Sequence, residues 1–179
     1  MPQIKPFNWR RHARDVLQFQ KEIYENNFPG FVATEEFLRG YGQQIRQYMT
    51  SHTDGLFVLE EDGRTCGFLW LSLISTMVDP CIGYIKNIYV APELRGRGCG
   101  KMLLTFAEAW CSRRGVARIA LDASCCNETA VKLYEKTGYR TVRVRMEKAI
   151  EPSAEAQEEG TFLAELNKYL GTPLGGEPH

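Results

Sequence analysis

The most constraining feature of this chain is a strand-like segment that runs through spaced glycines directly into a helix. Residues 85–110 read IKNIYVAPELRGRGCGKMLLTFAEAW, and Gly96, Gly98 and Gly100 separate a β-branched stretch from one with helical apolar spacing. Glycines leave backbone N–H groups unshielded, and the first turn of a helix adds unpaired N–H groups and the positive end of its dipole. The pattern predicts a cradle for an anion such as a pyrophosphate.

Three kinds of phosphate cradle place their glycines differently, and two of them do not fit. A Walker loop requires G-x-x-x-x-G-K-[ST], but Arg95 stands at its first glycine and Met102 at its hydroxyl position. A dinucleotide fingerprint requires G-x-G-x-x-G, but Lys101 stands at the last glycine. The third kind, [QR]-x-x-G-x-[GA], fits Arg95, Gly98 and Gly100.

The third pattern extends into a longer resemblance on two segments. Residues 88–100, IYVAPELRGRGCG, resemble the pyrophosphate-binding segment of the GCN5-related N-acetyltransferases, the GNAT family. Residues 127–139, NETAVKLYEKTGY, resemble that family's second signature, N-x-x-A-x-x-L-Y-x-x-x-G-[FY]. The resemblance implies a mixed α/β (α+β) fold, in which helices flank a central, mostly antiparallel sheet whose central strands are splayed.

The resemblance also implies a cofactor, acetyl-CoA, and the residues that hold it. The glycine turn is expected to bind the pyrophosphate, and the strand before it to pair with the pantetheine arm. Asn127 is expected to touch the cofactor, although its side chain also suits a helix N-cap, and both roles are compatible. The expected cofactor-binding residues are Ile88, Tyr89, Val90, Arg95, Gly96, Arg97, Gly98, Cys99, Gly100, Lys101, Asn127 and Tyr134.

Two side chains are expected to move protons in the reaction. Tyr134 stands where the family carries a tyrosine that protonates the departing thiolate. Many members carry a carboxylate on the strand before the glycine turn, but here that position reads Lys86-Asn87. A second subgroup, the ribosomal-protein N-terminal acetyltransferases, carries an acid five residues before the motif asparagine, where this chain has Asp122. Asp122 is therefore the expected base, acting through water, with a loop-satisfying role as the alternative.

The implied reaction is direct transfer of an acetyl group to a primary amine in a ternary complex. The acceptor, a small molecule or a peptide or protein amine, cannot be identified from the sequence. The alternative is a non-catalytic acetyl-CoA-binding module, in which Lys86-Asn87 marks the loss of a base. Two acidic residues beside a predicted hairpin turn, Glu60 and Glu61, are expected to be solvated.

Charge and cysteine content limit the expected partners, metal sites and compartment. The 179 residues carry no formal net charge, so no nucleic-acid or membrane partner is expected. The six cysteines lack metal-ligand spacing, which argues against a metal site, and the absence of a signal core favours the cytoplasm.

Residues 1–150 are expected to form one acetyltransferase domain. Residues 151–179 are expected to form an acidic tail with a short docking helix at 161–170. A homodimer is among the assemblies that the sequence allows.

The pattern of apolar residues predicts the order of elements along the chain. Apolar residues at helical spacing predict helices, and β-branched or alternating stretches predict strands. The predicted helices cover residues 11–26, 34–49, 98–114 and 127–137. The predicted strands cover residues 3–7, 56–59, 65–77, 84–90, 117–122 and 139–146.

Overall fold

The computed structural model describes residues 1–28 and 30–148 of the chain. The chain divides at Arg140 into two units, and all the regular elements described lie in the first. The helices are α1 (Trp9–Asn27), α2 (Glu35–Tyr48), α3 (Cys99–Ser112) and α4 (Glu128–Lys136), with a short 3-10 turn at Pro92–Leu94. The strands are β1 (Gln3–Pro6), β2 (Asp54–Glu61), β3 (Arg64–Ile74), β4 (Ile82–Val90) and β5 (Ile119–Leu121).

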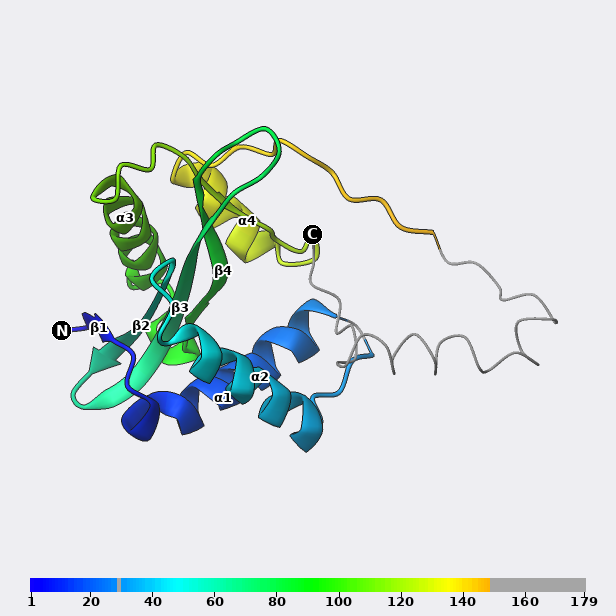
Figure 1. The fold of residues 1–179 in the computed structure, drawn as a ribbon. Coiled ribbons are helices and arrows are strands. Elements are labelled where there is room, and N and C mark those ends of the chain that lie inside the picture. The colour runs from blue at the N-terminus through cyan, green and yellow to red at the C-terminus, as the bar shows by residue number, and fades with distance from the viewer. Residues whose placement is uncertain (29, 149–179) are drawn as a thin grey trace, which may run out of the picture. The chain divides into compact units, whose positions relative to one another are not determined.

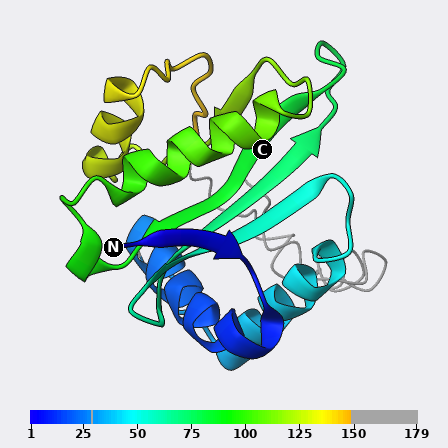
Figure 2. The same ribbon diagram turned by 90° about the vertical axis from the view of Figure 1, so that its left-hand side faces the viewer.

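The strands form one sheet in the order β1-β2-β3-β4-β5. Neighbouring strands are antiparallel except β4 and β5, which are parallel. Helices α1 and α2 pack on one face of the sheet, and α3 crosses the other face (Figures 1 and 2). The predicted fold class, a mostly antiparallel sheet flanked by helices, is confirmed.

Local sequence signals explain where several elements begin and turn. The side chain of Asn8 accepts a hydrogen bond from the N–H of Arg11 and caps α1, and Thr34 caps α2 in the same way through Phe37. Asp62 and Gly63, with φ angles of 51° and 78°, both adopt the left-handed conformation. That pair suits the tight hairpin joining β2 to β3, because such turns need positive φ at both central residues.

The core lies on both faces of β3. Phe68 contacts Phe7, and Trp70 contacts Tyr41 and Tyr48, so these strand residues point toward α1 and α2. Leu69 and Leu71 are fully buried and point to the opposite face, toward α3, because successive strand side chains alternate. Burial on both faces explains why β3 is almost continuously apolar rather than alternating.

Glu60 corrects one expectation from the sequence. Its side chain is 4% exposed rather than solvated, and it binds Lys5, Arg11 and His12. The hydrogen bond from Lys5 is the main cause that lowers the pKa of Glu60. The cluster fastens β1 and the first turn of α1 to β2, which the hairpin position of Glu60 in the sequence did not indicate. Glu61, also expected to be solvated, is part-buried and pairs with Arg97.

The predicted strand at 139–146 is wrong. Residues 139–148 contain no helix or strand, and Val142, Val144 and Met146 are largely exposed. Alternation is a local property, whereas a strand needs a partner for its backbone groups. None of the strands described pairs with this segment. The predicted docking helix at 161–170 and the boundary at residue 150 lie outside the described residues.

Candidate active site

The central feature of the sheet is the point where β4 and β5 separate. Strand β5 pairs with β4 only at Gly83, Tyr84 and Ile85. On the other side of β4, the register with β3 shifts, and Lys86 is the extra residue of a β-bulge. From Lys86 to Val90, no strand in the described part of the chain pairs with the outer edge of β4. The predicted splay of the central strands is therefore present.

The backbone of this open edge can pair with an extended ligand. The N–H of Ala91 donates to Cys66 on β3 at 2.9 Å, so the backbone groups of Val90 point the opposite way, to the open edge. The backbone groups of Ile88 point to the same edge, whereas those of Tyr89 point toward β3. The carbonyl of Val90 accepts a hydrogen bond from Arg95 Nε at 3.0 Å, which joins the strand end to the glycine turn.

The glycine turn presents consecutive free N–H groups. Gly96 and Gly98 have φ angles of 74° and 80°, and a Cβ at either residue would meet nothing within 4 Å. Left-handed backbone therefore requires these glycines, since no neighbour crowds them. Gly98 also stands at the N-cap of α3 without a side-chain cap. Within residues 1–28 and 30–148, no protein acceptor binds the N–H groups of residues 96–101.

The cations around the turn have different surroundings. Arg97 forms a two-pronged ion pair with Glu61 on β2, with N···O distances of 2.8 and 3.0 Å. Arg95 is directed to Val90. Lys101 has no ion-pair partner among the described residues. The turn's positive potential therefore comes chiefly from backbone N–H groups, the helix start, Lys101 and Arg95, because a hydrogen bond to a carbonyl leaves the charge of Arg95 uncompensated.

Gly100 and Cys99 serve packing as well as the turn. A Cβ at Gly100 would come within 2.8 Å of Leu133 Cδ2, so this glycine lets the start of α3 approach α4. Cys99, the first residue of α3, is buried in the core. Gly100 has no side chain and that of Cys99 is covered, so only the backbone groups of these two residues are available at the turn.

Asn127 caps α4, as its alternative role predicts. Its side-chain oxygen accepts from the N–H of Ala130 at 3.2 Å, and its amide nitrogen donates to Asn27 Oδ1 at 3.4 Å. The second bond links the end of α1 to the start of α4. Contact between Asn127 and a cofactor remains a prediction.

Tyr134 lies on α4 with its ring beside that of Tyr139, at a centroid distance of 5.9 Å. Burial raises the pKa of Tyr134 to about 12, because the ionised phenolate would lose hydration there. The hydroxyl is therefore protonated at neutral pH, which is the state that a proton donor needs.

Asp122 follows directly after β5, at the separation point. The register that pairs Ile85 with Leu121 puts Asp122 level with Lys86. The Tyr84 hydroxyl donates to Asp122 Oδ2 at 2.8 Å. No local sequence signal indicated this partner, because Tyr84 is distant in the chain and belongs to the neighbouring strand.

The face of β4 toward α1 carries polar pairs that sequence reasoning missed. Asn87 Nδ2 donates to Gln20 Oε1 at 2.7 Å, and Gln20 Nε2 donates back at 3.4 Å. Tyr89 donates to Glu22 and stacks on Phe19. Asn87 is thus held in place by the fully buried Gln20. Strand β4 itself contains no Asp or Glu that could serve as a base.

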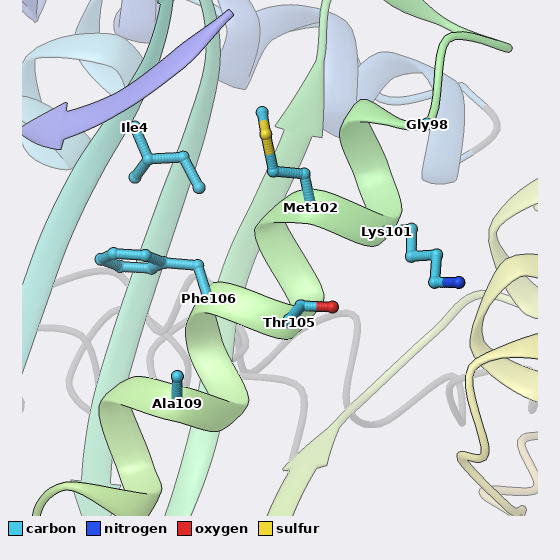
Figure 3. A pocket seen from close by; sticks show the side chains of 7 residues that line it. All are labelled: Ile4, Gly98, Lys101, Met102, Thr105, Phe106 and Ala109. Atoms are coloured by element: carbon cyan, nitrogen blue, oxygen red, sulfur yellow. The ribbon is translucent and has the colours of Figure 1, made fainter.

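A groove of about 500 Å³ runs along the flank of α3 that faces β1 (Figure 3). Met102, Phe106 and Ile4 form its apolar wall, and Lys101 extends from the other flank of the helix. Val90, Asp122 and Tyr134 do not line it, so the groove is separate from the separation point of β4 and β5.

Residues 1–28 and 30–148 contain neither a metal-binding cluster nor a helix that could span a membrane. No group of three or more His, Cys, Asp or Glu side chains gathers in a metal-binding arrangement there. None of the helices described has the length and apolarity needed to span a membrane.

Comparison with known proteins identifies the family. The sequence model of the acetyltransferase (GNAT) family matches residues 16–139. The chain belongs to this family. An uncharacterised N-acetyltransferase of Methanocaldococcus jannaschii is 28% identical over 150 residues, which cover 79% of this chain but only 64% of that relative.

Solved structures agree with this assignment. A putative acetyl transferase from Pyrococcus furiosus is 27% identical, with a TM-score of 0.67 over 84% of this chain and 100% of that one. The aminoglycoside acetyltransferase AAC(6')-Iy, bound to the bisubstrate analogue CoA-S-monomethyl-acetylneamine, is 20% identical. Its TM-score is 0.66, over 85% of this chain and 99% of that one, and this likeness shows the fold alone. The GNAT membership predicted from the two signatures is confirmed.

Proposed function

We propose that this chain is an acetyl-CoA-dependent N-acetyltransferase that transfers an acetyl group directly to a primary amine. One observation carries the proposal. The open edge of β4 ends at Val90, and the unpaired N–H groups of residues 96–101 follow immediately. A ligand whose extended arm lies along β4 and whose pyrophosphate lies at the turn matches both the open edge and the unpaired N–H groups. GNAT membership and the CoA conjugate bound by a protein of the same fold support the same ligand.

Bound acetyl-CoA would supply a thioester whose carbonyl carbon accepts the amine. The N–H of Val90 points to the open edge and is proposed to polarise that carbonyl. Asp122, level with the bulge, is proposed to accept the amine proton through water. Tyr134 is proposed to donate its hydroxyl proton to the departing CoA thiolate, so that the protons balance. The proposed cofactor contacts keep the predicted residues, with Ile88 and Val90 acting through backbone groups.

A second candidate function is a non-catalytic acetyl-CoA-binding module. The observation in its favour is the Asn87–Gln20 pair, which occupies the strand position where many family members carry a carboxylate. In this case Asp122 would serve only to accept the hydrogen bond from Tyr84.

Calorimetry and turnover together distinguish the two functions. Titration of the full chain with acetyl-CoA measures binding, and thiol release in the presence of peptide N-termini, lysine peptides, polyamines and amino sugars measures transfer. Binding with amine-dependent CoA release supports the enzyme. Binding with no release for any amine supports the module, and no binding refutes both.

Three further properties remain proposals. The acceptor is a small-molecule amine or an amine of a peptide or protein, and light scattering of the purified chain would test whether it forms the homodimer that the sequence allows. The cytoplasm remains the proposed compartment, because all six cysteines are free thiols, which suits a reducing environment. Cell fractionation would test this assignment.

A further inference from the structure

Lys86 occupies an unusual place for a cation. It is the bulge residue of β4, at the point where β5 leaves the strand. Its ammonium nitrogen lies 4.2 Å from the ring centroid of Tyr48 and 5.1 Å from that of Trp70. Both rings belong to the face of the sheet covered by α1 and α2. Two aromatic faces stabilise a lysine cation without neutralising its charge.

No carboxylate in the described part of the chain neutralises this lysine. None lies within 4.0 Å of its ammonium group. Asp54 binds the other side of Trp70 through the indole N–H at 2.9 Å, and it also accepts from Ser51 and Ser72. Burial alone would raise the pKa of Asp54, but these hydrogen bonds lower it overall. Its oxygens are thus already occupied.

Asp122 forms no ion pair with Lys86 either. It lies level with Lys86 across the gap between the strands, but its Oδ2 accepts the hydroxyl of Tyr84. Lys86 is half-buried, so part of its hydration is already removed. A partly desolvated cation without a direct ion-pair partner attracts any anion that reaches it, because the attraction is screened less than at a fully exposed site.

A cluster of aromatic rings extends from Trp70, beside the lysine, to the surface. Neighbouring ring centroids lie 4.7 to 6.4 Å apart, from Trp70 to two exposed phenylalanines near the end of α1. The rings are those of Trp70, Tyr41, Phe37, Tyr24, Phe28 and Phe31. Trp70 and Tyr41 are buried within this cluster, whereas Phe28 and Phe31 are exposed, so the rings open to a ligand are those near the end of α1.

We propose that Lys86 determines acceptor specificity by binding an anionic group on the acceptor. The acceptor would be a small amine that also carries a carboxylate or a phosphate. This inference rests on the proposed acetyltransferase function. It separates this chain from enzymes whose acceptors are polycations, because a positive charge beside the reacting amine repels a second cation.

Matched acceptors test the proposal on the purified full chain. L-phenylalanine and L-phenylalaninamide share ring and amine and differ in the carboxylate. Glucosamine-6-phosphate and glucosamine differ in the phosphate, which distinguishes the two sources of anion. Because the amines in a pair differ in basicity, the measured quantity is each acceptor's KM in the variant relative to wild type, with kcat recorded separately.

Lys86→Met retains the length of the side chain and removes the charge. We expect it to raise KM for at least one anionic acceptor by about tenfold or more, and to leave its neutral partner within about twofold. Lys86→Glu should reverse the preference within that pair. Lys136→Met, at the exposed end of α4, is the matched control and should change neither KM. Calorimetric binding of acetyl-CoA should be unchanged in all variants.

Three outcomes would overturn the inference while leaving the proposed function intact. These are equal KM changes for both members of each pair, a change in kcat alone, or wild-type turnover only with polyamines or aminoglycosides. Acetyl-CoA binding without turnover of any amine would instead refute the proposed enzyme. Circular dichroism and the acetyl-CoA titration identify a Lys86 variant that has simply lost its fold, and the Glu and Met variants provide independent readings.

Discussion

The two sides of the candidate site are built from different parts of the polypeptide. On the cofactor side, the open edge of β4 and the turn at residues 96–101 offer backbone N–H and C=O groups. On the opposite side, around Lys86, the contacts come from side chains on α1, α2, β3 and β4. The open edge and the turn occupy one continuous stretch of sequence, residues 86–101, whereas the contacts around Lys86 combine segments that are distant in the chain.

This difference separates what the family shares from what one member can change. A backbone cradle needs glycines at fixed φ values and a strand edge, and most side-chain substitutions leave both intact. A wall of side chains changes its charge and shape with single substitutions, as Lys86 and Asn87 illustrate. We therefore expect cofactor binding to be typical of the family and acceptor choice to be particular to this chain.

The largest expected effect comes from Asp122, which lies at the boundary between the two sides. Asp122→Asn can still accept the hydrogen bond from Tyr84 but cannot take a proton at neutral pH. We expect kcat/KM to fall about 10²-fold or more near neutrality, and its rise with pH to be lost. The pH profile of kcat/KM is the measurement. A mutant that keeps the wild-type profile and loses only stability would make Asp122 a structural residue.

A somewhat smaller loss is expected for Tyr134→Phe, which keeps the ring and removes the proposed proton donor. We expect kcat to fall about 10²-fold with little change in acetyl-CoA affinity, since a thiolate leaves tolerably well unaided. Because burial raises the pKa of Tyr134 to about 12, its ionisation should not reduce wild-type kcat between pH 7 and 10. Unchanged kcat in the variant would assign Tyr134 to packing alone.

Gly98→Val tests the backbone cradle itself. Valine at a φ of 80° is strained, and its side chain would cover the N–H groups at the start of α3. We expect acetyl-CoA binding to weaken about tenfold, measured by calorimetry. Gly115 has a φ of 74° and an equally open Cβ position, beyond the far end of α3. Gly115→Val is therefore a matched control for strain, and an equal loss of affinity there would refute the cradle.

The smallest effect on turnover is expected for Glu60→Gln, because the cluster fastens α1 to the sheet away from the separation point. The free energy of unfolding should fall by about 2 kcal/mol at pH 7, since the buried carboxylate accepts charged hydrogen bonds. The folded state lowers the pKa of Glu60, so its stabilisation is present above about pH 4.3, the unfolded value, and is lost as the pH falls through the lowered one.

Urea unfolding at pH 7 and at pH 4 measures this contribution. The variant should be less stable at pH 7 and lose less stability on acidification than wild type. An equal acid dependence in both proteins would remove Glu60 from the account of acid stability. A loss of acetyl-CoA affinity in the variant would show that the two sides of the site are coupled through α1.

The sequence by itself predicted most of the fold and located the glycine turn on which the proposed cofactor half of the candidate site rests. Helix caps, glycines at special φ angles and apolar periodicity are local, so they predicted the elements up to α4 and the two signatures. The strand predicted at 139–146 failed, because alternation does not supply the partner that a strand requires.

Only the tertiary structure decided which side chains meet across the sheet. It placed Tyr84 on Asp122, Gln20 on Asn87 and the rings of Tyr48 and Trp70 beside Lys86. It also buried Glu60 in a cluster with three basic side chains. These contacts depend on strand register, on one bulge and on the packing of α1 and α2, which are long-range properties. The residues next to each other in the chain do not encode these contacts. They do encode a glycine turn, which is a local structure.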